Sequence, residues 1–156
     1  MRKLGVVMFL LAIAGMLSGC GGGKSAPAPK PMDLDVKVGS AANDGKVFYM
    51  VVRSLTDKQF MTDSYQDVAG LAFSEPPDPS VLGTFALIPG KNETLKVMKP
   101  TQNSLALYFL FTNPSDQWKN IEGQPLAKAY SVALGKDQVA IQPKKKSLLM
   151  RILWPF

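Results

Sequence analysis

The side chain best suited to covalent chemistry is Cys20, which is the only cysteine among the 156 residues. The preceding residues Ser18 and Gly19 are small, so a processing enzyme can approach the backbone there. A thiolate is a strong nucleophile towards alkylating groups, so this thiol is the candidate for covalent modification. The alternative is a soluble secreted protein with one free cysteine. With one cysteine, no disulfide within the chain and no multi-thiolate metal site is expected.

Other residue types offer little for catalysis. The chain has no histidine, the commonest general base and metal ligand. Its twelve carboxylates fall mostly in predicted turns or on outward-facing strand positions, and Asp57, Asp63 and Asp67 are equally explained as helix caps. The glycines 21–23 precede neither a strand nor the helix start of a phosphate-binding loop. We therefore expect a binding protein with no enzymatic activity, no catalytic residue and no metal site.

The segment before Cys20 has the features of a secretory signal. Arg2 and Lys3 give it a positive start, and the run from Leu4 to Leu17 contains no charge. This run is too short to span a bilayer comfortably, because crossing the hydrocarbon takes about 20 helical residues. Residues 1–19 are therefore predicted to be a signal peptide that targets the chain and need not anchor it.

The four residues from Leu17 to Cys20 resemble the lipobox of bacterial lipoproteins. The resemblance implies that the thiol receives a diacylglyceryl group, that the signal is cleaved just before Cys20, and that the new amine is acylated, as with palmitate. More than one acyl chain gives lasting attachment to a membrane. The sorting rule of such lipoproteins implies the outer membrane, facing the periplasm, because Gly21 rather than an aspartate follows the cysteine. The only cofactor expected is thus the covalent lipid on Cys20.

The remaining chain is expected to consist of a tether and one domain. Residues 20–32 contain glycine, proline and small polar residues, which suit a flexible lipidated tether. Residues 33–156 are long enough for one domain with a sizeable core. Removing residues 1–19 lowers the formal charge from +6 to +4, because Arg2 and Lys3 leave and no acid leaves with them. Lysines are dispersed except at 144–146, so nucleic acid is not an expected partner.

Period-two alternation of apolar and polar residues dominates the domain and predicts strands. Residues 33–38 alternate clearly, whereas 47–52 and 104–111 are apolar on both faces and suit the interior of a sheet. Further strands are expected within 83–90, 93–99, 126–134 and 137–142, and the Asn43-Asp44-Gly45 turn is expected to join the first two strands as a hairpin. Seven short strands predict an all-β, two-sheet β-sandwich.

One insertion interrupts the strands. Thr56 with Gln59, and Ser64 with Asp67, are helix-start patterns. These patterns predict a helix over Tyr65 to Leu71. The aromatic and apolar residues of this insertion are expected to cover one open end of the sandwich or to belong to a binding surface; they are Phe60, Tyr65, Leu71 and Phe73.

The order of these features resembles that of TssJ (VasD/SciN-like), the outer-membrane lipoprotein of the type VI secretion system. The matching motifs are the lipobox, "DLDVKV", "VVRSLTDKQF", "MTDSYQDV", "VLGTFALIPG" and "LALYFLFTNPSDQWKN". The resemblance implies a transthyretin-like β-sandwich with a short helical insertion. It also implies an anchor that ties a membrane complex to the outer membrane by binding the periplasmic domain of the inner-membrane protein TssM. The alternative is a periplasmic lipoprotein that binds a small ligand, lipid or peptidoglycan.

Two short segments are candidates for binding the partner. In the family, a protruding loop after the first strand contacts TssM, and the loop here is shorter, "GSAANDG". The candidates in it are Ala41, Ala42, Asn43, Asp44, Gly45 and Lys46, because the turn is expected to be exposed and to have no core role; the alternative is an ordinary tight turn. Trp118 is the second candidate, as a partly exposed hot spot, or it packs over a sheet edge.

The C-terminal residues 144–156 combine three consecutive lysines with a strongly apolar stretch. Three interpretations are open: a last sheet strand with Ser147 and Arg151 on the wet side, a segment on the membrane surface, or a segment that pairs with a partner's sheet. The last strand is the favoured one. So many large apolar side chains left exposed would promote aggregation, so the segment is expected to be covered.

Overall fold

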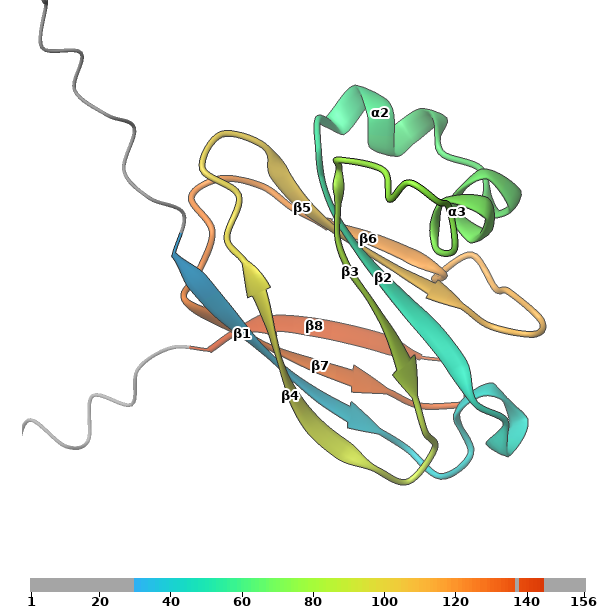
Figure 1. Cartoon of the computed structure of the whole chain (residues 1–156). Helices are drawn as coiled ribbons and strands as arrows, with labels where there is room; N and C mark the ends of the chain where they lie inside the picture. The colour runs from blue at the N-terminus through green and yellow to red at the C-terminus, as the bar shows by residue number, and fades with distance from the viewer. Residues whose placement is uncertain (1–29, 137, 145–156) are drawn as a thin grey trace, which may run out of the picture.

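The computed structural model describes residues 30–136 and 138–144, which form two four-stranded sheets packed face to face (Figure 1). Sheet A has the strand order β4-β1-β7-β8 and sheet B the order β3-β2-β5-β6. The elements are β1 (Pro31–Val38), η1 (Ala42–Gly45), β2 (Phe48–Leu55), α2 (Asp57–Thr62), α3 (Tyr65–Leu71), β3 (Val81–Leu87), β4 (Asn92–Met98), β5 (Ser104–Leu110), β6 (Lys119–Glu122), β7 (Ala129–Leu134) and β8 (Val139–Pro143). The predicted fold class, a β-sandwich with a short helical insertion, is confirmed. In these residues no helix has both the length and the apolar character required to cross a membrane.

Strand β1 shows how alternation in the sequence becomes one buried and one wetter face. Its even-numbered residues from Met32 to Val38 are buried, and its odd-numbered residues are half-buried or exposed. The strand begins at Pro31, two residues before the predicted domain start, because Pro31 pairs with Met98 and the Lys99 amide donates to the Lys30 carbonyl at 2.9 Å. Proline is tolerated at the first residue of a strand, because its missing N–H removes few hydrogen bonds from the ladder there.

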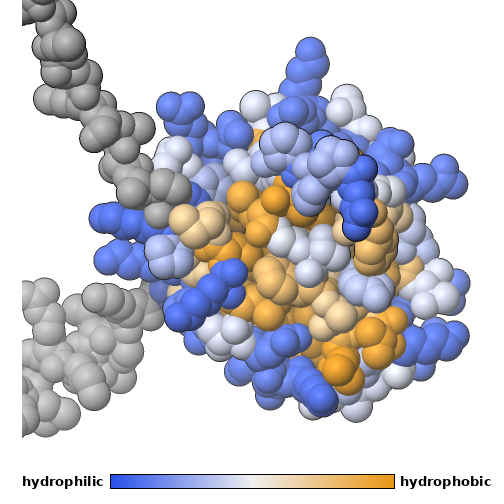
Figure 2. All heavy atoms as spheres, in the orientation of Figure 1, coloured by the Kyte–Doolittle hydropathy of each residue, from blue (hydrophilic) through white to orange (hydrophobic). Residues whose placement is uncertain are grey.

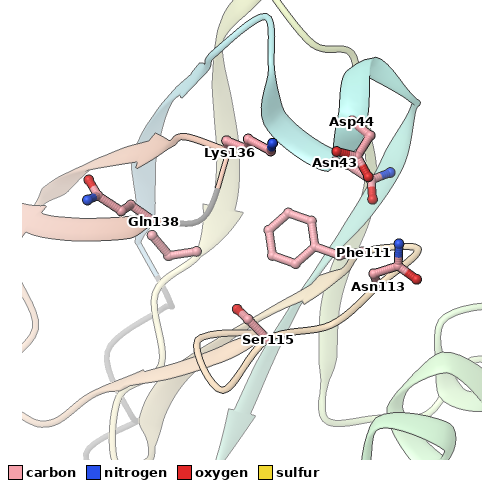
Figure 3. A pocket seen from close by; sticks show the side chains of 8 residues that line it. Asn43, Asp44, Phe111, Asn113, Ser115, Lys136 and Gln138 are labelled. Atoms are coloured by element: carbon pink, nitrogen blue, oxygen red, sulfur yellow. The ribbon is translucent and has the colours of Figure 1, made fainter.

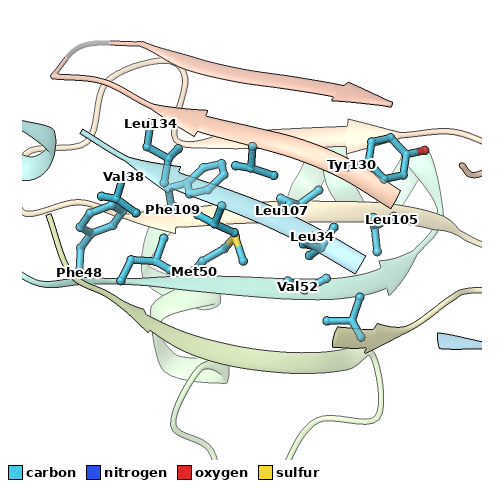
Figure 4. Packing of buried hydrophobic residues seen from close by; sticks show 14 of the residues in the cluster. Leu34, Val38, Phe48, Met50, Val52, Leu105, Leu107, Phe109, Tyr130 and Leu134 are labelled. Carbon is cyan, nitrogen blue, oxygen red and sulfur yellow. The ribbon is translucent and has the colours of Figure 1, made fainter. Parts of the chain in front are cut away.

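The main core lies between the two sheets, where side chains from β1, β2, β5 and β7 interdigitate (Figure 4). Leu34, Met50, Val52, Leu107 and Phe109 are fully buried there. The core is thus formed by residues that alternate along each strand, as a sandwich requires.

Sheet B is covered on its outer face as well as on the face that packs against sheet A. Helices α2 and α3 lie over this face (Figure 1), and Val68 of α3 is buried there together with the strand residues Val51, Leu55, Ala106 and Tyr108. This cover explains why β2 and β5 are apolar on both faces, as predicted. The expectation that the helical insertion covers an open end of the sandwich is wrong, because the outward side chains of β2 and β5 provide the larger apolar surface.

The hairpin expected between the first two strands is also absent. Strand β1 lies between β4 and β7 in sheet A, and β2 lies between β3 and β5 in sheet B, so neither has a free edge for the other. The chain between them crosses from one sheet to the other through η1.

Strand β6 was not predicted, whereas the helix predicted over Tyr65 to Leu71 is found with these bounds. Strand β8 is an edge strand of sheet A. Lys144 follows it, and the Lys144 amide donates to the Ala129 carbonyl at 2.9 Å. The last strand predicted within 144–156 falls on residues 145–156, which lie outside the described residues.

Candidate functional site

The domain has two distinct ends, which the direction of β1 defines. The tether end is where β1 begins at Pro31, within the last two residues of the predicted tether 20–32. The loop end is where β1 stops at Val38, about 23 Å away at 3.3 Å per residue. Four loops meet at the loop end, and hydrogen bonds connect them. The Gly39 amide donates to the Leu134 carbonyl, the Gly90 amide donates to the Val38 carbonyl, and the Thr112 amide donates to the Asn43 side chain. This end therefore presents the loops 39–47, 88–91, 111–118 and 135–138 together.

Asn43 fixes the shape of the first loop. Its side-chain Oδ1 accepts from the Thr112 amide at 2.7 Å, and its Nδ2 donates to the Lys46 carbonyl at 3.1 Å. Asn43 and Asp44 have positive φ angles of 48° and 53°, a conformation that asparagine and aspartate tolerate better than most residues. Asn43 thus joins the loop 39–47 to the loop that follows β5.

The candidate residues in this loop are only partly exposed. Ala41, Asp44, Gly45 and Lys46 are exposed, but Ala42 is fully buried and Asn43 is only 7% exposed. The expectation that the turn has no core role is therefore wrong for Ala42 and Asn43, because the chain must pack here as it crosses between sheets. Their partner-binding role stays a prediction, and the surface available to a partner comes from Ala41 and residues 44–46.

We expect Asn43→Ala to lower the free energy of unfolding by about 2 to 5 kcal/mol. The change removes the acceptor for a backbone amide, which costs about 1–3 kcal/mol, and places alanine at a positive φ angle, which costs roughly 1–2 kcal/mol. Chemical denaturation measures the total. Asn43→Gly removes the same hydrogen bonds without the backbone strain and should be less destabilising; equal losses would contradict the assigned strain.

A small cavity of about 100 Å³ lies among the loops at this end (Figure 3). Phe111 points into it between η1 and the loop after β7, and Asp44 and Lys136 place opposite charges at its rim. Typical small-molecule sites have volumes of about 300–1,000 Å³, so this cavity is too small for such a ligand. The described residues also contain no cluster of three or more acidic or thiol side chains that would hold a metal ion.

An apolar patch lies next to these loops on the outer face of sheet B. It consists of Val47, Tyr49, Phe73 and Ile88, whose exposed fractions are 54%, 37%, 61% and 40%. The Tyr49 and Phe73 rings meet edge to face with centroids 5.0 Å apart. On the face of the molecule drawn in Figure 2, hydrophobic side chains extend across the centre and down to the end where β1 stops. Exposed aromatic residues beside a set of loops are typical of protein-binding surfaces.

Sequence reasoning missed this patch. Residues 47–52 were assigned to a sheet interior, but the helices cover the outer face only from Val51 onward and leave Val47 and Tyr49 exposed. The sequence does contain a signal for the patch, because Val47 and Tyr49 alternate on the outward side at the start of β2 and Phe73 follows just beyond α3. This signal can be recognised only when the positions of the helices are known.

Trp118 lies away from the apolar patch, within an aromatic cluster under α3. Its ring centroid is 5.2 Å from that of Tyr65 and 5.6 Å from that of Tyr108, and it is half-buried. The Tyr65 hydroxyl donates to the Phe111 carbonyl at 2.5 Å, and burial raises the pKa of Tyr65. Trp118 thus packs over the sheet and links it to α3, while a role in partner binding stays a prediction.

A buried polar network holds the segment between α2 and α3 on the sheet. The Arg53 guanidinium donates to the Asp63 carboxylate at 2.5 Å and to the Ser80 hydroxyl at 3.0 Å. The Tyr108 hydroxyl donates to the same carboxylate, and Lys119 Nζ donates to the Asp63 carbonyl at 2.9 Å. Burial, followed by the nearby Asp63 carboxylate, raises the pKa of Tyr108 well above its usual range. Asp63, expected only as a helix cap, therefore has a structural role in anchoring the insertion.

Comparisons with known proteins identify a family model and solved structures that are similar to this chain. The family profile described as "IglE, N-terminal domain" matches residues 49–134, from within β2 to the end of β7. A search among curated proteins gave no significant match.

Among solved structures, the chain is similar to the T6SS lipoprotein TssJ1 from Pseudomonas aeruginosa, with 15% identity and a TM-score of 0.57 over 76% of this chain and 98% of that one. It is similar to Serratia marcescens Lip, a membrane-bound component of the type VI secretion system, with 15% identity and a TM-score of 0.58 over 76% and 99%. A chain in a structure of the TssM C-terminal domain (869–1107) from EAEC matches with 14% identity and a TM-score of 0.52 over 71% and 99%.

These structural likenesses establish a shared fold over nearly the whole of the solved chains and 71–76% of this chain, and they agree with the TssJ-like order of motifs in the sequence. The profile covers more than half of the chain and includes six of the eight described strands in whole or in part, from β2 to β7. The chain therefore belongs to the IglE family and has the β-sandwich fold of the TssJ lipoproteins.

Proposed function

We propose that this protein is a lipoprotein of a type VI secretion membrane complex, attached to the periplasmic face of the outer membrane by lipid on Cys20. It binds the periplasmic domain of a TssM-like inner-membrane protein and so ties the complex to the outer membrane. The lipobox and the fold of the TssJ lipoproteins support this proposal. Occurrence of the fold in a structure of the TssM C-terminal domain supports the choice of partner.

The observation that carries the proposal is the separation of the two ends. The tether joins β1 at one end of the domain, whereas the exposed residues of the loop 39–47 and the apolar patch gather at the other. A domain attached to a membrane through the first end therefore presents the second end towards the periplasm. This arrangement suits a protein that connects a membrane to a partner.

The alternative of a small-ligand carrier has less support. The cavity at the loop end is about 100 Å³, and the space between the sheets is filled by apolar side chains. The exposed aromatic residues Tyr49 and Phe73 instead offer a contact area of the kind that protein interfaces use. The proposed activity is thus binding between proteins, without catalysis.

The test is a pull-down from detergent-solubilised membranes, followed by affinity measurement with the recovered periplasmic domain. We expect the unsubstituted chain and C20S to retain the same large inner-membrane protein, because lipid is needed for placement and not for contact. Phe73→Ala should weaken the affinity at least tenfold, as expected for an aromatic hot spot. Met61→Ala on α2 is the matched control, since Met61 is 76% exposed but outside the patch, and it should bind normally.

Recovery of no membrane protein by either the unsubstituted chain or C20S would refute the partner proposal. If Phe73→Ala and Met61→Ala bind alike, the partner is retained but its contact surface lies elsewhere than the apolar patch.

A further inference from the structure

Strand β3 is an edge strand whose free side carries none of the usual protection. It pairs with β2 on one side, and the strand order of sheet B places no described strand on its other side. Its sequence, from Val81 to Leu87, contains neither a charged residue nor a proline. Free edges of this kind favour pairing with another chain, and proteins usually block them with charge, proline, a very short strand or a covering segment.

The register of sheet B shows which backbone groups of β3 face the free side. In antiparallel strands the N–H and C=O of one residue point to one side, and those of the next residue point to the other. The Ser54 amide of β2 donates to the chain just before β3, so the even-numbered residues of β2 point towards β3. Met50 is paired with Phe85, which therefore points back to β2. The backbone groups of Thr84 and Ala86, on either side of Phe85, consequently face the free side.

These outward groups are available for pairing. Among residues 30–136 and 138–144, no backbone group of a turn, loop or cap bonds with Thr84 or Ala86. Ala86 is exposed, and Thr84 is half-buried. A shift of register opposite Val52 and Arg53 marks a bulge at the start of β3, so the regular part of the edge is 83–87.

The other edges of the two described sheets are protected. Strand β4 carries Lys96 and, on its core-facing side, Glu93, which are charges that discourage pairing. Strand β6 is only four residues long. On the free side of β8, the Val139 amide already donates to the Gln117 side chain at 3.1 Å, and Pro143 has no N–H to offer. This contrast distinguishes the β3 edge as a surface kept open.

Both faces of the β3 edge suit apolar side chains of an added strand. On the core-facing side, Leu82 and Phe85 are half-buried at the margin of the main core. On the outer side, Thr84 and Ala86 are small, and Ala86 is paired with Tyr49 of the apolar patch. Large apolar side chains could therefore cover Phe85 on one face and lean over the small residues to Tyr49 on the other.

We propose that the β3 edge binds an extended, largely uncharged segment of the partner protein, which adds a fifth strand to sheet B. This inference rests on the proposed function and specifies how the partner is held, by backbone hydrogen bonds along β3 beside the apolar patch. Lys46 and Lys91 are exposed next to the patch residues Val47 and Ile88. An acidic residue of the segment at the loop end complements these two charges.

A second copy of this chain is the competing occupant. Strand β3 runs towards the loop end, because Leu87 leads into the loop 88–91. Antiparallel pairing of two β3 edges around a twofold axis would place the tether end of one copy beside the loop end of the other. One of the two tethers would then have to run back along its domain to reach the same membrane. A segment of a different protein meets no such conflict.

The test titrates the periplasmic domain recovered in the pull-down against two proline variants of C20S. Ala86→Pro removes an outward N–H of β3 and leaves the bonds to β2 intact, so it should weaken the affinity at least tenfold, because a partner carbonyl loses its donor. Lys96→Pro is the matched control. It makes the same change on the free side of β4, since the Lys99 amide bonds towards β1, and it should bind normally. Urea denaturation of each free variant checks that it folds.

Amide hydrogen exchange tests the same contact in C20S without a proline. The Thr84 and Ala86 amides should exchange rapidly in the free chain and at least tenfold more slowly in the complex. The Thr94 and Lys96 amides, on the free side of β4, should exchange alike in both. A contact through side chains of the apolar patch alone would leave all four amides unprotected.

Equal affinities of the two folded proline variants would overturn the strand addition while leaving the partner proposal standing. Unchanged exchange of Thr84 and Ala86 in a complex that forms would have the same meaning, and it decides the matter if Ala86→Pro does not fold. Protection of both amides in the free chain would also refute the proposal, with sedimentation telling a second copy from a segment of the chain itself. Failure of the proposed function has a different signature, since the pull-down would then recover no membrane protein.

Discussion

We expect Asp63→Ala to lower the free energy of unfolding by about 3–5 kcal/mol, the loss that follows when one partner of a buried ion pair is removed. The Arg53 and Asp63 side chains are only 7% and 14% exposed, so the guanidinium would remain buried without its counterion. The Tyr108 hydroxyl would lose its acceptor in the same change. Urea denaturation followed by fluorescence measures the effect.

Two companion variants make this result specific. Lys144→Ala breaks the exposed pair with Asp35, whose side chains are 50% and 22% exposed, and should cost less than about 1 kcal/mol. The double variant Arg53→Met with Asp63→Leu removes both charges and should recover much of the stability lost in Asp63→Ala. A loss below about 1 kcal/mol in Asp63→Ala would show that the pair does not hold the helical insertion.

The second large effect is expected for Cys20→Ser in the full-length protein expressed in cells. Without the thiol no lipid is added, and the loss removes about 0.8 kcal/mol for every methylene otherwise buried in the bilayer. Extraction of membranes with high salt should leave the unsubstituted protein in the pellet and release the variant.

Gly21→Asp is the matched control for lipidation, because it leaves Cys20 in place. The sorting rule implied by the lipobox resemblance predicts that this variant stays bound in high salt but moves to the inner membrane, which density-gradient separation of the two membranes detects. If Cys20→Ser withstands high-salt extraction as the unsubstituted protein does, the assignment of Cys20 as the lipid site is wrong.

Local signals in the sequence predicted individual elements well. The alternation from Asp33 to Val38 predicted β1, and Ser64 followed by Asp67 predicted α3, where the Ser64 hydroxyl indeed accepts from the Asp67 amide. Both signals depend on neighbours within a few residues, so the local sequence contains the physical cause. Strand β6 lacked such a signal, because Lys119, Asn120 and Glu122 are polar and the strand depends on pairing with β5.

Pairing between distant strands could not be predicted in the same way. The turn residues from Asn43 to Gly45 favour a hairpin, yet the edges of β1 are occupied by strands about 60 and 95 residues further along the chain. For the same reason, burial of Asn43 was not foreseen, since it depends on the Thr112 amide. The candidate loop 41–46 was located by sequence, whereas the adjacent apolar patch became visible only once the helices were placed.

The position of β1 within sheet A has a mechanical consequence for a protein held at both ends. In the proposed arrangement, a pull on the lipid anchor would act along β1 from Pro31, while a partner at the loop end would hold the other strands. Strand β1 is paired with β4 over seven residue pairs and with β7 over six, and these bonds lie across the direction of the pull. The load is thus a shear shared by both ladders at once, and the bonds resist together because they cannot be unzipped one at a time.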